Sequence, residues 1–186
     1  PFIDGVRHLR HHRVPFELQL IIGLPDETLD SLRESINFVA GLRADELAAH
    51  PLMVLPGTEL WRDAQALGLD YDPTPPYGIR STPTMPADEL HYARRLGVAV
   101  RALWESKTIR VLSREPGQTY VRVVEDWLDW RHGDGEALSS HPLETQVRAF
   151  TLDYCVRHDI PSAFYEASAA AELGTLAGAA IRRAKL

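Results

Sequence analysis

The stretch "LQLIIGLPDETLDSLRESINFVAGL", residues 18–42, decides the fold class of this chain. Its apolar start is typical of a buried strand, formed by Leu18, Leu20, Ile21 and Ile22. Gly23 and Pro25 then predict a tight turn. Apolar residues recur after it at helical spacing, at Leu29, Leu32, Ile36 and Val39. A strand that turns directly into an amphipathic helix is typical of α/β proteins.

The flanking residues extend this alternation of helix and strand. The pattern predicts a helix over residues 2–12, a strand over 15–23 and a second strand over 46–55. A third helix is predicted over 56–68, with Gly68 as its C-cap. Two strands are too few for a parallel sheet that is buried on both faces, so we expect this α/β half to be incomplete alone.

The second part of the chain has a different pattern. Five prolines in residues 70–86 exclude a helix or a central strand there. Helical periodicity follows, over residues 87–106, 118–131, 141–158 and 161–184. We therefore expect an α/β region over residues 1–69, a proline-rich connector over residues 70–86 and an all-helical C-terminal domain over residues 87–186.

Composition excludes several classes of protein. The 186 residues carry a net charge of -6, which argues against a general nucleic-acid binder. The sequence shows no apolar run long enough to span a membrane and no signal peptide, so we expect a cytoplasmic protein without a membrane partner. The chain begins with "PFIDGV" rather than Met, and we expect it to be a piece of a longer protein.

The turn after the first strand is the leading site candidate. Loops at the carboxyl ends of parallel strands face the ligand in such sheets, which would give Gly23, Asp26 and Glu27 a binding role. The alternative is structural, because Thr28 or Asp26 can serve as the helix N-cap and carboxylates there complement the helix dipole.

Other chemically reactive residues have simpler interpretations. His8, His11 and His12 lie among arginines and favour a solvated helix face over a metal site, so no metal ligands are predicted. His50 is a substrate-pocket candidate or a loop histidine. Cys155, the single cysteine, is expected to be a small buried hydrophobic residue.

Two tryptophans in the helical region allow two readings. Trp127 and Trp130 follow valines at helical spacing and favour core packing over a substrate platform.

Three segments together resemble the C-terminal half of a radical S-adenosylmethionine (SAM) domain. They are "LQLIIGLPDETLDSLRESINFV", "DELAAHPLMVLPGTELWRDAQALGL" and "PPYGIRSTPTMPADEL". The likeness is greatest to cobalamin-binding radical SAM proteins, which carry a "GLPGET" strand end and a later "LPGT" turn. It covers roughly residues 1–95 and implies the C-terminal portion of a partial (β/α) barrel, followed here by the all-helical domain.

The resemblance implies a SAM contact at the first strand. In that family a Gly-x-Ile-x-Gly-x-x-Glu-like pattern contacts SAM, and here Ile21, Gly23 and Asp26 match its later places. Gln19 replaces the first glycine, and Glu27 is a neighbouring carboxylate that could substitute for the acidic residue.

The resemblance also implies contacts farther along the chain. The end of the second strand, with Leu52, Met53 and Val54, would pack against the adenine ring. Tyr77, in the proline-rich segment, would lie near the mouth of the barrel as a second substrate-pocket candidate, or would pack its ring within a structured linker.

The chain departs from the family in its cysteines. Three thiolates of a Cys-x-x-x-Cys-x-x-Cys loop hold the [4Fe-4S] cluster in such enzymes, whereas this chain has only Cys155. The complete protein would therefore use SAM, a [4Fe-4S] cluster and, by the likeness, cobalamin. We expect this chain to be inactive and to bind none of these alone, with the missing N-terminal part of the same protein as its partner.

Three functions follow from these observations. The first is a fragment of a cobalamin-dependent radical SAM methyltransferase or related bond-forming enzyme, acting on a small-molecule or peptide substrate. The second is a radical SAM enzyme without cobalamin, like a methylthiotransferase or coproporphyrinogen oxidase. The third is a non-catalytic helical interaction module. An open edge of the parallel sheet also predicts homo-oligomers.

Overall fold

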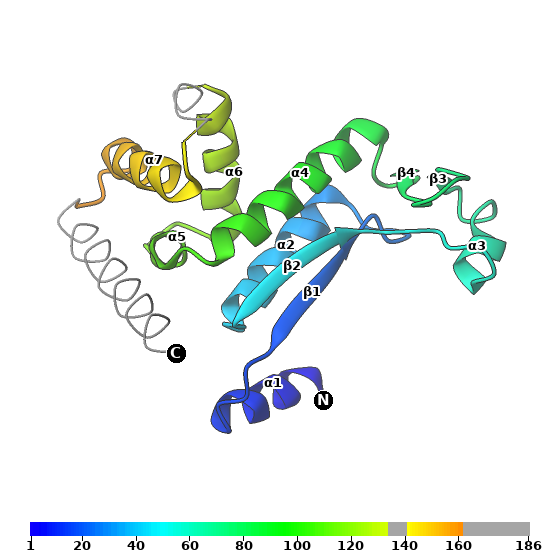
Figure 1. The fold of residues 1–186 in the computed structure, drawn as a ribbon, viewed down its shortest axis with the longest axis horizontal. Helices are drawn as coiled ribbons and strands as arrows, with labels where there is room; N and C mark the ends of the chain where they lie inside the picture. Colours follow the sequence, from blue (N-terminus) through cyan, green and yellow to red (C-terminus); the bar gives the residue numbers. More distant parts are fainter. Residues whose placement is uncertain (134–140, 162–186) are drawn as a thin grey trace, which may run out of the picture. The chain divides into compact units, whose positions relative to one another are not determined.

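The computed structural model describes residues 1–133 and 141–161 (Figure 1). It is a mixed α/β structure that divides into two compact units, Pro1–Leu103 and Trp104–Leu186. Among the described residues, no helix is long and apolar enough to cross a membrane.

The first unit is built on two parallel strands joined by a helix. Strand β1 (Glu17–Ile22) pairs with β2 (Glu46–Pro51), and helix α2 (Leu29–Gly41) makes the crossover between them (Figure 1). Helix α1 (Phe2–His11) precedes β1. These elements confirm the alternation that the sequence predicts over residues 2–55.

Helix α2 begins where the sequence predicts. Thr28 is its N-cap, and the Thr28 hydroxyl accepts a hydrogen bond from the Ser31 backbone N–H at 3.1 Å. The Ser31 hydroxyl in turn accepts from the Thr28 N–H at 3.0 Å, which completes a reciprocal capping box. Leu32, Ile36 and Val39 form the buried face of the helix.

The predicted third helix is shorter than its pattern suggests. Helix α3 comprises only Glu59–Asp63, with Thr58 as its N-cap, and is followed by turns up to Gly68. Gly68 has a φ of +64°, the left-handed conformation expected for a residue that ends a helical segment.

The proline-rich segment belongs to the first unit. It contains two short antiparallel strands, β3 (Asp70–Tyr71) and β4 (Ile79–Ser81). Ile79 donates a backbone hydrogen bond to the Leu52 carbonyl at 3.0 Å, which joins the segment to the chain beyond β2. The observed division therefore differs from the expected one, because residues 70–86 pair with the α/β core.

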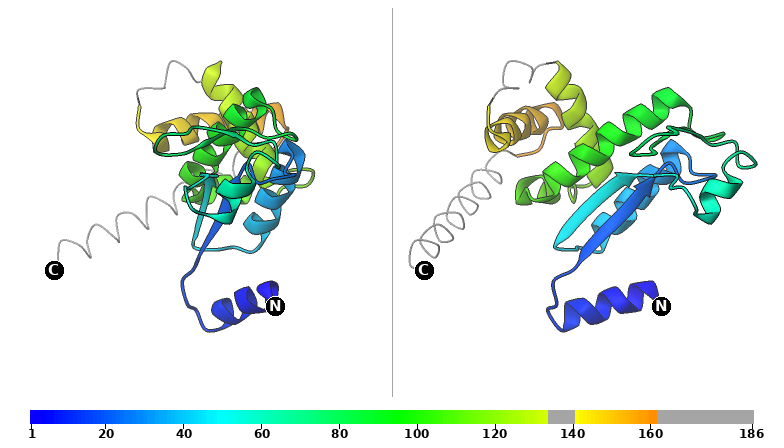
Figure 2. Two further views of the ribbon diagram at one scale, coloured as in Figure 1. Left: turned by 90° about the vertical axis from the view of Figure 1, so that its right-hand side faces the viewer. Right: turned by 45° about the vertical axis from the view of Figure 1, so that its right-hand side comes forward.

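Helix α4 (Ala87–Trp104) packs against the sheet through a glycine (Figure 2). A Cβ atom on Gly97 would lie 2.6 Å from Ile22 Cδ1 and 3.3 Å from Ala49 Cβ, so the helix lies directly against β1 and β2. For this reason α4 belongs to the first unit, although the sequence places it with the helical domain.

The described elements of the second unit are helices joined by turns. It contains α5 (Lys107–Leu112), α6 (Tyr120–His132) and α7 (Leu143–Arg157). The sequence predicts α6 and α7 but not the short α5. The expected helix over residues 161–184 lies, after Pro161, outside the described residues.

Aromatic rings form the core of the second unit. Trp130 and Phe150 pack edge to face with centroids 5.7 Å apart, and the Tyr154 hydroxyl donates to Gln118 Oε1 at 2.6 Å. Trp127 and Trp130 are buried, as core packing predicts, and Cys155 is a buried residue of α7.

Candidate functional site

The candidate site lies where the two parallel strands end. Directly after β2, the Leu52 backbone N–H donates to the Ile22 carbonyl at 2.8 Å. The loop after β1 and the segment after β2 are therefore neighbours at the carboxyl edge of the sheet. This edge is where ligands bind in parallel α/β folds.

Gly23 begins the loop after β1 and must be a glycine. Its φ is +86°, and a Cβ atom there would lie 3.0 Å from both Ile79 Cγ2 and Leu90 Cδ1. Strand β4 and helix α4 thus approach the backbone so closely that a side chain would overlap them.

The Glu27 side chain folds back onto the backbone of this loop. Its Oε2 atom accepts a hydrogen bond from the Gly23 backbone N–H at 2.7 Å. Partial burial raises the pKa of the Glu27 carboxyl, whereas the hydrogen bonds from the Gly23 and Leu24 backbones act in the opposite direction. The Glu27 carbonyl also accepts from the Thr84 hydroxyl at 2.7 Å. The carboxylate of Glu27 therefore stabilises the loop through the Gly23 backbone.

Asp26 is placed differently from its neighbour. It is exposed and has a φ of +64°, in the left-handed region that aspartate adopts more readily than most residues. Because Thr28 caps α2, Asp26 does not take the N-cap role that the sequence also allows. Of the two candidate carboxylates, Asp26 is the one available to a ligand.

Leu52 and Val54 are core residues. Their side chains are 8% and 0% exposed, and the Val54 backbone N–H donates to the Tyr77 carbonyl at 2.8 Å. The exposed side chain of this segment is Met53, at 48%. The alternation of buried and exposed positions in an extended chain is the signal that distinguishes Met53 from its neighbours.

Ile21 and His50 lie side by side on the open face of the sheet. They are register partners in the parallel pair, and both are exposed, Ile21 by 47%. Since side chains alternate along a strand, they face away from the side on which Ile22 and Ala49 meet α4. The prediction that Ile21 is buried is therefore wrong, because this face of β1 is not covered at that position.

Tyr77 is brought beside the same edge by backbone pairing. It is half-buried, has a φ of +59° and follows the cis peptide bond between Pro75 and Pro76. Its backbone N–H donates to the Thr74 carbonyl at 2.8 Å. The structure thus brings Tyr77 next to Val54, a proximity that the sequence alone does not predict.

The described residues do not form a metal or cluster site. In residues 1–133 and 141–161, no three His, Cys, Asp or Glu side chains gather closely enough to hold an ion. The rings of His8 and His12, at the end of α1, lie tilted against each other with centroids 4.4 Å apart. Cys155 is buried in the second unit, and a single thiolate does not fit the ligand set of a [4Fe-4S] cluster.

No protein-family model matches this chain, and a comparison with curated proteins finds no match. Exposed Ile21 and Met53 offer apolar surface, and Asp26 offers a carboxylate.

Proposed function

We propose that this chain supplies part of the S-adenosylmethionine pocket of a radical SAM enzyme, a cobalamin-dependent methyltransferase or a related bond-forming enzyme. The observation that supports the proposal most is the hydrogen bond from the Leu52 N–H to the Ile22 carbonyl, which places the loop after β1 and the segment after β2 at the same end of the sheet. Strands β1 and β2 with α2 would form one repeat of a partial (β/α) barrel, and the second unit would be its helical extension.

The chemistry of the edge fits this ligand. SAM carries an aromatic adenine ring, whose faces can pack on apolar side chains, together with a positive sulfonium, an ammonium and a carboxylate group. Met53 would contact the ring, and the exposed Asp26 carboxylate would attract the positive groups. Glu27 would act indirectly, because its hydrogen bond with the Gly23 N–H fixes the loop that presents Asp26.

The bound SAM would supply radical chemistry to the complete enzyme. The residues of this chain would orient its nucleoside part, and orientation alone can account for a large share of a rate enhancement. The [4Fe-4S] cluster does not fit the single Cys155, so its three thiolates, like a cobalamin-binding region, would come from outside this chain.

Asp26 allows a test that leaves the fold intact. In the complete enzyme, purified and assayed without oxygen, we expect Asp26→Gly to raise the KM for SAM about tenfold, the size of a lost charged contact. Glycine keeps the left-handed conformation at this position. Asp63→Ala, which removes an exposed carboxylate from α3, is the matched control. Equal KM values for Asp26→Gly and the control would contradict the proposal.

Tyr77 and His50 are the proposed substrate-pocket residues. We expect Tyr77→Phe and His50→Ala to lower turnover of the complete enzyme while the thermal midpoint stays within about 2 °C, since neither change creates a core cavity. A parallel loss of turnover and thermal midpoint would assign both residues to packing only.

A helical interaction module is the second candidate, and α7 provides the observation for it. Leu152 and Val156 are four residues apart on this helix and are 46% and 81% exposed, an apolar pair available to a partner protein.

A radical enzyme without cobalamin would share the SAM pocket of the first proposal. The presence or absence of a cobalamin-binding region in the complete protein separates those two enzymes.

Oligomerisation is expected from the open edge of the two-stranded parallel sheet. We propose that the isolated chain self-associates through its open parallel edge. Light scattering over a concentration series should show a mass above that of the 186-residue monomer. A constant monomer mass would contradict self-association.

A further inference from the structure

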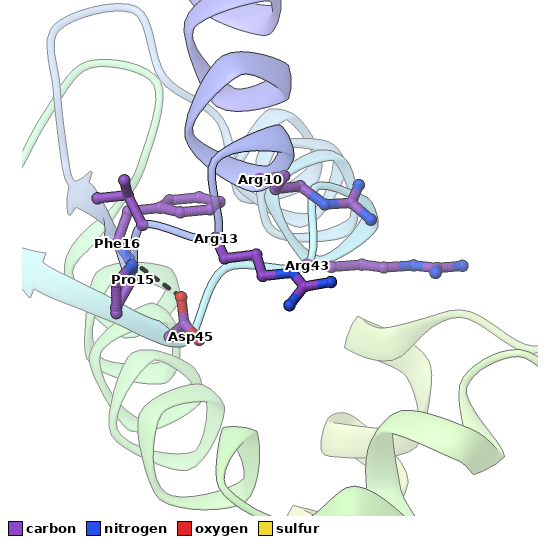
Figure 3. Close-up of a pocket in the computed structure, with 7 residues that line it drawn as sticks. Arg10, Arg13, Pro15, Phe16, Arg43 and Asp45 are labelled. Atoms are coloured by element: carbon purple, nitrogen blue, oxygen red, sulfur yellow. Dashed lines mark hydrogen bonds between the residues drawn. The ribbon is translucent and has the colours of Figure 1, made fainter.

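A small cavity lies at the opposite end of the sheet from the candidate site. Its volume is about 250 Å³, and three of its lining residues are arginines, Arg10, Arg13 and Arg43 (Figure 3). They come from the end of α1, the turn after it and the turn after α2. Figure 3 shows their guanidinium groups projecting to the same side of the chain.

These arginines lack the ion-pair partners that other arginines have. Arg7, Arg33, Arg80 and Arg157 each pair with an aspartate. Within residues 1–133 and 141–161, Arg10, Arg13 and Arg43 form no ion pair.

The one acidic residue of the cavity has a structural role. Asp45 Oδ2 accepts a hydrogen bond from the Phe16 backbone N–H at 3.0 Å, and the Asp45 N–H donates to the Phe16 carbonyl at 3.0 Å. These two bonds tie the start of β1 to the start of β2. The side chains that line the cavity carry three positive charges and one negative charge, which leaves a net charge of +2 (3 - 1).

Two of the arginines occupy backbone conformations that disfavour a side chain. Arg13 has a φ of +55° and Arg43 a φ of +56°, where glycine is the residue of least strain. Arginine is not required there by the turn itself. Helix C-termini attract positive charge, which is the explanation for these arginines that involves no ligand. That explanation accounts for a positive charge at each turn, but not for three arginines that line one cavity.

We propose that this cavity binds the phosphate group of a small phosphomonoester. Guanidinium groups form paired hydrogen bonds with phosphate oxygens, and several arginines together are typical of such sites. Val14 and Phe16 supply an apolar wall for the body of the ligand. The volume lies below the roughly 300–1,000 Å³ of pockets for drug-sized ligands, so the ligand is small. This site is separate from the proposed SAM pocket and does not depend on it.

The test is a titration of the 186-residue chain, labelled with ¹⁵N, with phenyl phosphate and with inorganic phosphate. Saturable chemical-shift changes are expected at residues 13–16 and 43–46. Arg43→Gly and Arg13→Gly should each weaken phenyl phosphate binding at least about tenfold, since each removes charged hydrogen bonds. Arg10→Gln, in a helix that tolerates glutamine, provides the same test without altering a turn.

Two further variants make the test specific. Arg62→Ala, on α3, removes one exposed positive charge outside the cavity and should leave the affinity unchanged. Asp45→Asn keeps an oxygen for the Phe16 N–H and removes the negative charge, so it should tighten binding about threefold or more. The proposal is overturned if the shifts do not saturate, or if Arg62→Ala weakens binding as much as Arg43→Gly does.

Discussion

The two ends of the β1–β2 sheet use left-handed backbone conformations in opposite ways. At the carboxyl end the left-handed residue against the core is Gly23, with β4 and α4 packed over it. At the amino end the left-handed residues include Arg13 and Arg43, which line an open cavity. At its buried left-handed position the carboxyl end thus uses glycine, as close packing requires, although the more exposed Asp26 and Tyr77 there are left-handed too. The amino end places arginines at such positions, at a conformational cost.

The largest expected effect concerns the packed end. Gly23→Ala should lower the free energy of unfolding by about 2–4 kcal/mol, because it adds backbone strain to overlap with Ile79 and Leu90. Gly57→Ala is the matched control, with a φ of +84° and no atom within 4 Å of the added Cβ. It should cost about 1 kcal/mol. Equal losses in urea unfolding would show that packing at Gly23 adds nothing.

A second glycine, Gly97, tests the effect of close packing at a position without left-handed backbone strain. Gly97→Ala should lower the unfolding free energy by about 1–2 kcal/mol, since the new Cβ meets Ile22 and Ala49 and this overlap outweighs the gain in helix propensity. Gly5→Ala, in α1 with no atom within 4 Å, should instead raise it by about 0.5–1 kcal/mol. If both variants gain stability in urea unfolding, α4 does not lie directly on the sheet.

The helix cap at the carboxyl end contributes less. Thr28→Ala removes the acceptor for the Ser31 N–H and should cost about 1 kcal/mol in the same measurement. Thr28→Ser keeps the hydroxyl and should lower the unfolding free energy by only a few tenths of a kcal/mol. A loss for Thr28→Ser equal to that of Thr28→Ala would indicate that the threonine methyl group, not the cap, is needed.

At the amino end of the sheet, substitutions at left-handed positions should raise the unfolding free energy instead of lowering it. Arg13→Gly and Arg43→Gly relieve the left-handed strain, and each should raise the unfolding free energy by about 0.5 kcal/mol after the entropy cost of glycine. A loss of stability would break the comparison, because it would mean that these side chains hold the amino end together.

The smallest expected effect is a dependence on pH. Burial raises the folded-state pKa of Glu27 above its ordinary value of 4.5, so the folded chain binds this proton more tightly than the unfolded chain. The contribution is fully present below the unfolded pKa and is lost as pH rises through the folded pKa. Relative to the native chain, Glu27→Gln should therefore gain stability as pH rises above 4.5. A constant difference in urea midpoints between the two chains would contradict this.

Local patterns predict part of this structure. The apolar run of β1, the helical spacing of α2 and the cap at Thr28 are all visible in adjacent residues. The pairing of Ile79 with Leu52, and hence the place of Tyr77, depends on backbone contacts between distant segments. The exposure of Ile21 depends on which face of the sheet is covered.

The loop after β1 and the arginine cavity also differ in how far local sequence patterns predict them. Gly23, Asp26 and Glu27 lie within five residues of one another, and their place after a strand identifies them as a loop at a sheet edge. The sequence does not show which carboxylate turns inward, because that depends on the hydrogen bond from Gly23. The arginine cavity joins residues about 30 positions apart, so no local motif predicts it.

The most direct test of the central claim is the reading frame that encodes this chain, compared with the intact mass of its natural product. The proposal of a SAM pocket predicts a larger product with a Cys-x-x-x-Cys-x-x-Cys loop encoded before Pro1. A natural product that begins at Pro1 would contradict it, and would leave Gly23 and Glu27 as residues that stabilise a loop.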